Sequence, residues 1–203
     1  MSWNLCVYIT CRRAYFFHTY PFSPTVTGTL YAINGWDVLI DNNTKLSLGA
    51  AVNVNTDRFS LQLLYLGGPE LAGTDPPWRH YIDTILTYKP SKTVALTLNA
   101  DYAKEGDTSW YGAAGYVAYA TTDTTTLGVR AELFADPDGA RTGVAGGQTL
   151  SEITGTYTWK FGTHLAARLE LRWDHSSEDV FLKNDGTATS SQVTLAANYL
   201  GMF

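Results

Sequence analysis

The chain has 203 residues and a net charge of −5, with 45% hydrophobic and only 16% charged residues. The charged fraction is below the roughly 25% that is usual for soluble domains. The negative net charge argues against nucleic-acid binding, which needs a clustered basic surface. No run of about 18 apolar residues occurs, which excludes a transmembrane helix.

Residues 1–24 form a poorly specified N-terminal segment. Its basic pair, Arg12–Arg13, follows the apolar stretch instead of preceding it, so the segment is not a good signal peptide. "YITCRRAYFFHTY" (8–20) is interpreted as the remnant of a truncated strand. Cys6 and Cys11 are too few for a disulfide framework and are interpreted as incidental thiols.

From residue 25 onward the sequence alternates between apolar and polar residues with period two, the pattern of β-strands. In "LAARLELRWD" (165–174), for example, Leu169, Leu171 and Trp173 alternate with charged residues. The pattern predicts ten strands, in chain order at 25–34, 46–54, 59–67, 80–89, 93–102, 110–120, 126–133, 152–161, 164–174 and 192–203.

The connections between these stretches alternate between long and short from residue 35 onward. "NTDR" (55–58) and "GT" (162–163) are short, whereas "GWDVLIDNNTK" (35–45), "KEGDTS" (104–109) and "HSSEDVFLKNDGTATS" (175–190) are counted as long. Outer-membrane barrels have tight periplasmic turns and longer outer loops. Residues 25–203 are therefore predicted to form an all-β, antiparallel, up-and-down transmembrane barrel with about ten strands in this chain, which can be part of a larger barrel.

Strand length and aromatic placement favour a membrane barrel over a soluble sandwich. The predicted strands are about ten residues long, which is the length that a tilted strand needs to cross a bilayer. Strands of soluble proteins average about five or six residues. Aromatic residues near strand ends are candidates for the two interfacial girdles. They are Tyr88, Tyr102, Trp110, Tyr157, Trp159, Trp173, Tyr199 and the final residue, Phe203.

The polar row of each strand would then face the lumen. The candidate pore-lining residues are Asp83, Asp101, Arg130, Glu132, Lys160, Arg168, Glu170 and Arg172. We expect the arginines to meet the acidic residues across neighbouring strands. Two interpretations stay open: a charged constriction in a water-filled path, or a salt-bridged plug that fills a small barrel.

Seven stretches in order resemble the C-terminal part of the OmpL-like beta-barrel porin family. They are "NGWD" with "DNN" (34–43), "YLGGPE" (65–70), "WRHYIDTILTYKPS" (78–91), "LNADYAKEG" (98–106), "WYGAAGYVAY" (110–119), "RAELFADPDGARTG" (130–143) and "SSEDVF" (176–181). The resemblance covers about residues 25–203 and implies a bacterial outer-membrane porin without catalytic residues. Family members have further strands and a signal peptide upstream, so we expect a C-terminal fragment of a longer porin.

No residue pattern indicates catalysis or a metal. The histidines at 18, 80, 164 and 175 show no spacing that identifies a nucleophile pair. "DPDG" (136–139) and "DNN" (41–43) lack the spacing of a calcium loop and are typical turn sequences. We therefore expect no catalytic residue, no cofactor and no metal.

The leading interpretation is an outer-membrane porin through which small hydrophilic solutes or ions diffuse passively. Its expected partners are the lipid bilayer, small solutes or ions, and the barrel-assembly machinery acting on the C-terminal strand, with no nucleic acid. The alternatives are a non-conducting structural or adhesion barrel and a soluble ligand-binding barrel of lipocalin type. Solute selectivity and oligomeric state are left open.

Overall fold

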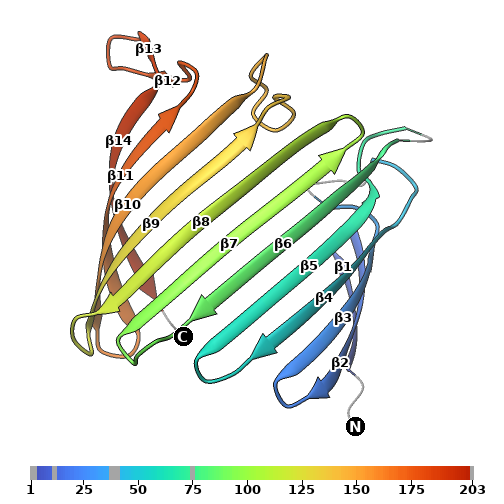
Figure 1. Cartoon of the computed structure of the whole chain (residues 1–203), viewed down its shortest axis with the longest axis horizontal. Coiled ribbons are helices and arrows are strands. Elements are labelled where there is room, and N and C mark those ends of the chain that lie inside the picture. Colours follow the sequence, from blue (N-terminus) through green and yellow to red (C-terminus); the bar gives the residue numbers. More distant parts are fainter. Residues whose placement is uncertain (1–3, 11–12, 37–41, 74–75, 202–203) are drawn as a thin grey trace. The chain divides into compact units, whose positions relative to one another are not determined.

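The computed structural model describes residues 4–10, 13–36, 42–73 and 76–201, and their regular structure is all β-strand (Figure 1). The chain divides into two compact units. One comprises Met1–Leu86 with Ala100–Ser109, and the other comprises Thr87–Asn99 with Trp110–Phe203. No helix in the described part of the chain is long and apolar enough to cross a membrane.

The first unit is an antiparallel meander in which each strand lies beside the next one in the chain. Its strands are β1 (Asn4–Thr10), β2 (Arg13–Ser23), β3 (Val26–Ile33), β4 (Ser47–Asn55), β5 (Phe59–Pro69) and most of β6 (Trp78–Tyr88). β7 (Val94–Glu105) divides between the two units after Asn99.

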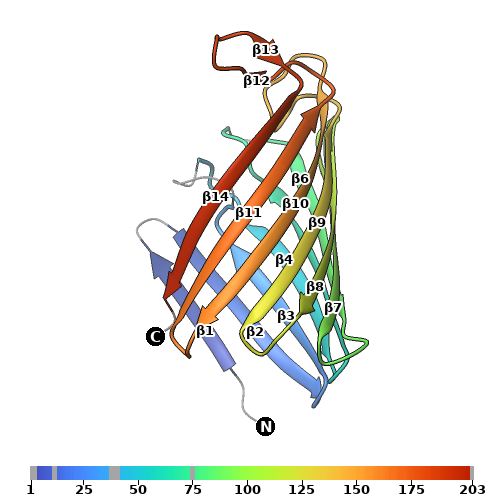
Figure 2. The ribbon, with the colours of Figure 1, turned by 90° about the vertical axis from the view of Figure 1, so that its left-hand side faces the viewer.

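The second unit repeats this arrangement in the order β8-β9-β10-β11-β14. Its long strands are β8 (Thr108–Ala120), β9 (Thr125–Asp136), β10 (Gln148–Phe161), β11 (Leu165–Ser176) and β14 (Ser191–Gly201). Figure 2 shows β14 beside β11 and β11 beside β10. The connection from β11 to β14 carries a small hairpin, β12 (Phe181–Leu182) and β13 (Ala188–Thr189), beyond the strand ends.

All ten predicted strands are present, and the antiparallel up-and-down fold class is confirmed. The structure adds two strands in residues 1–24, where at most a remnant of one was expected. β1 and β2 pair antiparallel from Asn4↔Thr19 to Thr10↔Arg13. Period two is hard to see in β2 because Phe16 and Phe17 are adjacent and Pro21 interrupts the run.

The expected alternation of long and short connections has one exception. "KEGDTS" (104–109) was expected to be a long loop, but β7 continues to Glu105 and β8 begins at Thr108. Only Gly106 and Asp107 remain between the strands, and Gly106 has φ 59°, which favours glycine in a tight turn.

The exposure of the two strand faces is the reverse of that in a soluble sheet, because many apolar side chains are exposed and several charged side chains are buried. Leu171 and Leu195 are 58% and 70% exposed, whereas Glu152, on the other face of the neighbouring strand, is 4% exposed. A soluble β-sheet buries its row of apolar side chains and exposes its row of polar side chains to water. Exposed apolar rows are stable where the surrounding medium is hydrocarbon, so this pattern matches the lipid-facing rows of a transmembrane barrel.

A close approach of β4 and β5 gives a stability prediction. A Cβ atom added at Gly68 would lie 2.5 Å from the Cα of Ser47, a backbone atom that cannot move without disturbing the strand pairing. Gly68→Ala is therefore expected to lower the free energy of unfolding by about 1–3 kcal/mol. Gly155→Ala is the control, because nothing lies within 4 Å of an added Cβ there. Urea unfolding in lipid vesicles measures both variants, and equal stability of the two would contradict the prediction.

Candidate functional site

The strand register of the second unit places three carboxylates in one row across the polar face. Glu152 of β10 lies opposite Glu132 of β9 on one side and Asp174 of β11 on the other. The next row along the strands holds two arginines, because Thr154 lies between Arg130 and Arg172. The five charged residues Arg130, Glu132, Glu152, Arg172 and Asp174 are called the charge cluster below.

Glu152 is the centre of the charge cluster. Its carboxylate receives Nε of Arg130 at 2.5 Å, a second Arg130 nitrogen at 2.8 Å and Nε of Arg172 at 3.2 Å. Arg172 also contacts Asp174 at 2.6 Å, whereas Glu132 approaches Arg130 only to 3.9 Å. The cluster is therefore a network of three strands in which one carboxylate joins two guanidinium groups.

The carboxylates and the guanidinium groups of the cluster differ in exposure. The side chains of Glu152 and Asp174 are 4% and 8% exposed, whereas those of Arg130 and Arg172 are 33% and 44% exposed. Glu132 is also open, at 41%. The two buried carboxylates thus lie against the sheet and fix the guanidinium groups, which remain accessible to water and ions.

Neutral polar side chains complete the hydrogen bonding of the buried carboxylates. The Thr154 hydroxyl donates to Oε2 of Glu152 at 2.7 Å, and Nε2 of Gln192 donates to Oδ2 of Asp174 at 3.1 Å. Buried carboxylates are stable only when they are paired and hydrogen-bonded. A pocket of about 250 Å³ lies beside the acidic row and includes Phe181 of the β12–β13 hairpin in its wall.

The remaining lining candidates lie outside the cluster. Arg168 and Glu170 lie on the same face of β11, farther along the strand toward the turn. Lys160 is exposed near the end of β10, opposite Ala166. Asp83 and Asp101 belong to the first unit. Both carboxylates interact electrostatically with Tyr81.

A second polar group, in the first unit, contains a buried ion pair. Arg79 makes two parallel hydrogen bonds to Glu105, at 3.0 and 2.9 Å, and their side chains are 6% and 9% exposed. The Arg79 guanidinium also lies over the ring of Trp36, 5.1 Å from its centroid. The pair therefore joins β6 and the end of β7 to the connection that follows β3.

Glu70, at the end of β5, anchors the same connection. Its carboxyl accepts hydrogen bonds from the backbone N–H of Trp36, at 2.9 Å, and from the hydroxyl of Ser47. Glu70 is 1% exposed. Desolvation by burial raises the pKa of Glu70 above its ordinary value of 4.5, although the Ser47 and Trp36 hydrogen bonds and Arg79 oppose the shift.

Glu70 gives a prediction for pH dependence. Because its pKa is raised in the folded state, its contribution to stability is fully present below about pH 4.5 and is lost as pH rises through the folded-state pKa. Glu70→Gln cannot ionise but retains a carbonyl oxygen for Trp36 and a donor for Ser47. Unfolding in urea from pH 4 to pH 8 should show the parent losing stability relative to Glu70→Gln. A difference that is independent of pH would contradict this assignment.

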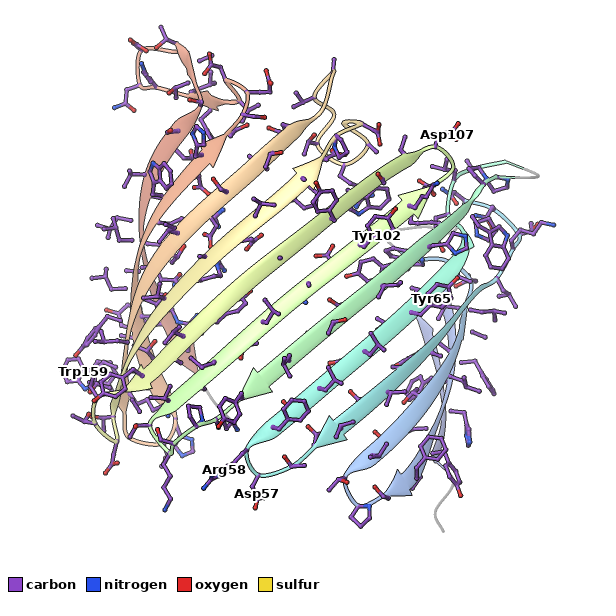
Figure 3. The ribbon with its side chains drawn as sticks, in the orientation of Figure 1. Asp57, Arg58, Tyr65, Tyr102, Asp107 and Trp159 are labelled. Atoms are coloured by element: carbon purple, nitrogen blue, oxygen red, sulfur yellow. The ribbon has the colours of Figure 1, made fainter. Side chains whose placement is uncertain are left out.

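Most of the girdle candidates lie on the exposed apolar face. Those exposed by more than 40% are Tyr88, Tyr102, Tyr157, Trp159, Trp173 and Tyr199. Trp159 and Tyr199 lie on either side of Ala167 in one row near the turn end of the second unit. In Figure 3, Tyr65 and Tyr102 lie near the end of the first unit that carries Asp107, whereas Asp57 and Arg58 occupy a turn at its other end.

The structure corrects one girdle candidate, Trp110, which does not lie on the exposed apolar face. It is 6% exposed and lies on the polar face of β8, with the Arg141 guanidinium 5.2 Å from the centroid of its ring. The neighbouring Tyr111 is 46% exposed and takes the place expected for Trp110. The error arose because two aromatic residues are adjacent and the sequence does not show which of them faces outward. Phe203 lies outside the described residues.

Several polar residues were missed although their positions indicate the correct face. Glu152 has the same parity as Thr154 and Thr156, and Asp174 has the same parity as Arg172. On the apolar face, Trp78 and Tyr65 both contact His80, whose Nδ1 lies 2.8 Å from the Tyr65 hydroxyl. Glu152, Asp174 and Tyr65 lie inside the predicted strands, so the alternation already indicates their faces, and Trp78 is included when the strand predicted at 80–89 begins two residues earlier.

The described residues contain no group of three or more His, Cys, Asp or Glu side chains that could hold a metal ion. The arrangement is instead a polar strand face with fixed charges, backed by a face of exposed apolar and aromatic side chains. Such a protein can present a charged aqueous path on one side and contact lipid on the other.

Comparison with known proteins identifies a family and a fold. A family model described as "Putative beta-barrel porin-2, OmpL-like" matches residues 16–203. The structure of the NanC porin aligns over 95% of this chain and 94% of its own, at 9% identity and a TM-score of 0.54. OmpT, an outer-membrane protein of Vibrio cholerae, aligns over 93% of this chain and 62% of its own, at 13% identity and a TM-score of 0.55. No curated protein matches the chain.

Proposed function

Since this chain belongs to the OmpL-like beta-barrel porin family, we propose that its polar strand face lines a water-filled path through which small hydrophilic solutes and ions diffuse passively. The protein is an outer-membrane porin of a bacterium, in contact with the lipid bilayer and with solutes. The family and the fold point to a channel and not to an enzyme.

The observation that carries this proposal is the opposite exposure of the two strand faces. Leu195 is 70% exposed and Leu169 is 50% exposed, whereas Glu152 and Asp174 are buried on the other face. Charged groups are stable within a bilayer only where they face a polar interior. The polar face is therefore the side along which hydrated solutes would pass.

Selectivity would come from the charge cluster. Arg130, Arg172 and Glu132 expose their charges, so a passing ion meets fixed charges of both signs within two neighbouring rows. Rings of charged side chains set ion preference through their local field. Asp83, Asp101, Lys160, Arg168 and Glu170 are proposed as further lining residues.

The exposed aromatic residues are proposed to form the interfacial girdles. Trp159 and Tyr199 would mark one interface, and Trp173, which stacks on His175 at 5.8 Å, would mark the other. Indole and phenol rings favour this depth because they combine an apolar body with a polar group. We also propose that the barrel-assembly machinery recognises the C-terminal strand, β14.

Swelling of liposomes that contain the folded protein tests the function. Vesicles diluted into iso-osmotic solutions of sugars of increasing size should swell, and the rate should fall as the sugar grows. Heat-unfolded protein is the control. Vesicles that contain folded protein but do not swell with the smallest sugar would favour a non-conducting structural or adhesion barrel instead.

A further inference from the structure

A second pocket lies on the polar face of the second unit, bordered by Arg130 of the charge cluster and extending from it toward the turns. It has a volume of about 310 Å³, and Tyr116, Thr126, Thr156, Thr158, Arg168 and Glu170 are among its lining residues. Its space comes from a row of small residues, since Gly128 lies between Ala118 and Thr156 in the register. We call it the hydroxyl pocket, because four threonines and one tyrosine are among its lining residues.

Arg168 differs from the other arginines of this face. Nε of Arg168 is buried and has no hydrogen-bond partner. Arg130 and Arg172 are both held by carboxylates, but no carboxylate in the part of the chain that the structure describes forms an ion pair with Arg168. A guanidinium group without an acceptor is the donor that an oxyanion satisfies best.

An acidic side chain, Glu170, also lines the hydroxyl pocket and is already hydrogen-bonded. Glu170 accepts hydrogen bonds from the Thr156 hydroxyl at 3.2 Å and from Nδ2 of Asn198 at 3.4 Å, one to each oxygen. The Glu170 oxygens are therefore held by Thr156 and Asn198, and among the described residues no ion pair joins Glu170 to Arg168. Arg168 lies opposite Thr158 on one side and Asn198 on the other, so neutral donors flank the guanidinium group.

We propose that the hydroxyl pocket binds the oxyanion group of a small solute, a phosphate or a carboxylate. Arg168 would donate to the anion, and the hydroxyls of Thr158 and Tyr116 would donate to its remaining oxygens. A volume of about 310 Å³ equals roughly ten water molecules, so a small anion fits with part of its hydration shell. The proposal rests on the passive-diffusion function, to which it adds a solute class.

Calorimetric titration of the folded, detergent-purified chain tests this site without relying on conduction. Inorganic phosphate and succinate are titrated separately at constant ionic strength. We expect saturable binding of at least one of them, weakened by tenfold or more in Arg168→Gln. Lys183→Gln is the matched control, because it removes the same charge from an exposed position in the β12–β13 hairpin, outside the pocket. Its affinity should equal that of the parent.

The two titrants separate the possible sources of the oxyanion. Binding of phosphate alone assigns a phosphorylated solute, binding of succinate alone assigns a carboxylate, and binding of both assigns a general oxyanion site. Absence of saturable binding to the parent, or equal weakening in Arg168→Gln and Lys183→Gln, would overturn the proposal. Failure of the pore is seen separately, as binding without liposome swelling, whereas swelling without binding rejects the pocket alone.

Discussion

Leu169→Arg is expected to lower the free energy of unfolding by about 2–4 kcal/mol. Leu169 lies midway along β11, between Tyr157 and Ala197, and its side chain is 50% exposed on the apolar face. In a bilayer this position contacts hydrocarbon, where a guanidinium group loses its hydration without gaining a partner. The measurement is urea unfolding of the protein in lipid vesicles.

Leu169→Phe is the matched control for this variant. It changes the size of the side chain but keeps an apolar group against the lipid, so we expect a change below about 1 kcal/mol. Equal stability of Leu169→Arg and the parent in lipid vesicles would mean that β11 turns its other face to the membrane.

Glu152→Gln is expected to destabilise the fold by about 2–3 kcal/mol and to shift ion preference toward anions. The amide cannot accept charge-assisted hydrogen bonds from both Arg130 and Arg172, and the two guanidinium groups lose the carboxylate that holds them together. The cluster then has two carboxylates for two arginines, instead of three. Urea unfolding gives the stability, and reversal potentials in a salt gradient give the ion preference.

Glu132→Gln separates these two effects, since it makes the same change in charge in the same row. Glu132 is 41% exposed and lies 3.9 Å from Arg130, so its ion pair contributes less than about 1 kcal/mol. We expect its reversal potential to shift in the same direction with little loss of stability. If Glu132→Gln destabilises the fold as much as Glu152→Gln does, the assignment of Glu152 as the centre of the charge cluster is wrong.

Period two in the sequence predicts ten strands, β3 to β11 and β14, but not β1 and β2, and for most of the ten it also predicts the face of each residue. Leu169, Trp159 and Tyr199 are exposed as expected, because one alternating row in contact with lipid constrains every second residue of a strand. Where two aromatic residues are adjacent, alternation does not show which of them faces outward. For this reason Trp110 was predicted on the wrong face and Tyr111 was not predicted as a girdle residue.

The ion pairs could not be predicted because they depend on register between strands. The sequence shows that Arg172 and Glu152 share the polar face, but only the pairing of β10 with β11 places Thr154 opposite Arg172 and brings Glu152 within reach. Alternation alone predicts that Arg172 meets acidic residues of neighbouring strands, but it does not show which ones. The structure shows that it is tied to both Glu152 and Asp174.

Single-channel recording in planar lipid bilayers tests the central claim most directly. The folded full chain should produce discrete and repeated current steps in potassium chloride. Folding is verified by a circular dichroism spectrum typical of β-strands and by a change in electrophoretic mobility on heating. Glu152→Gln should retain these steps with an altered reversal potential. Folded protein that inserts into the bilayer and gives no current steps would contradict a water-filled path along the polar face.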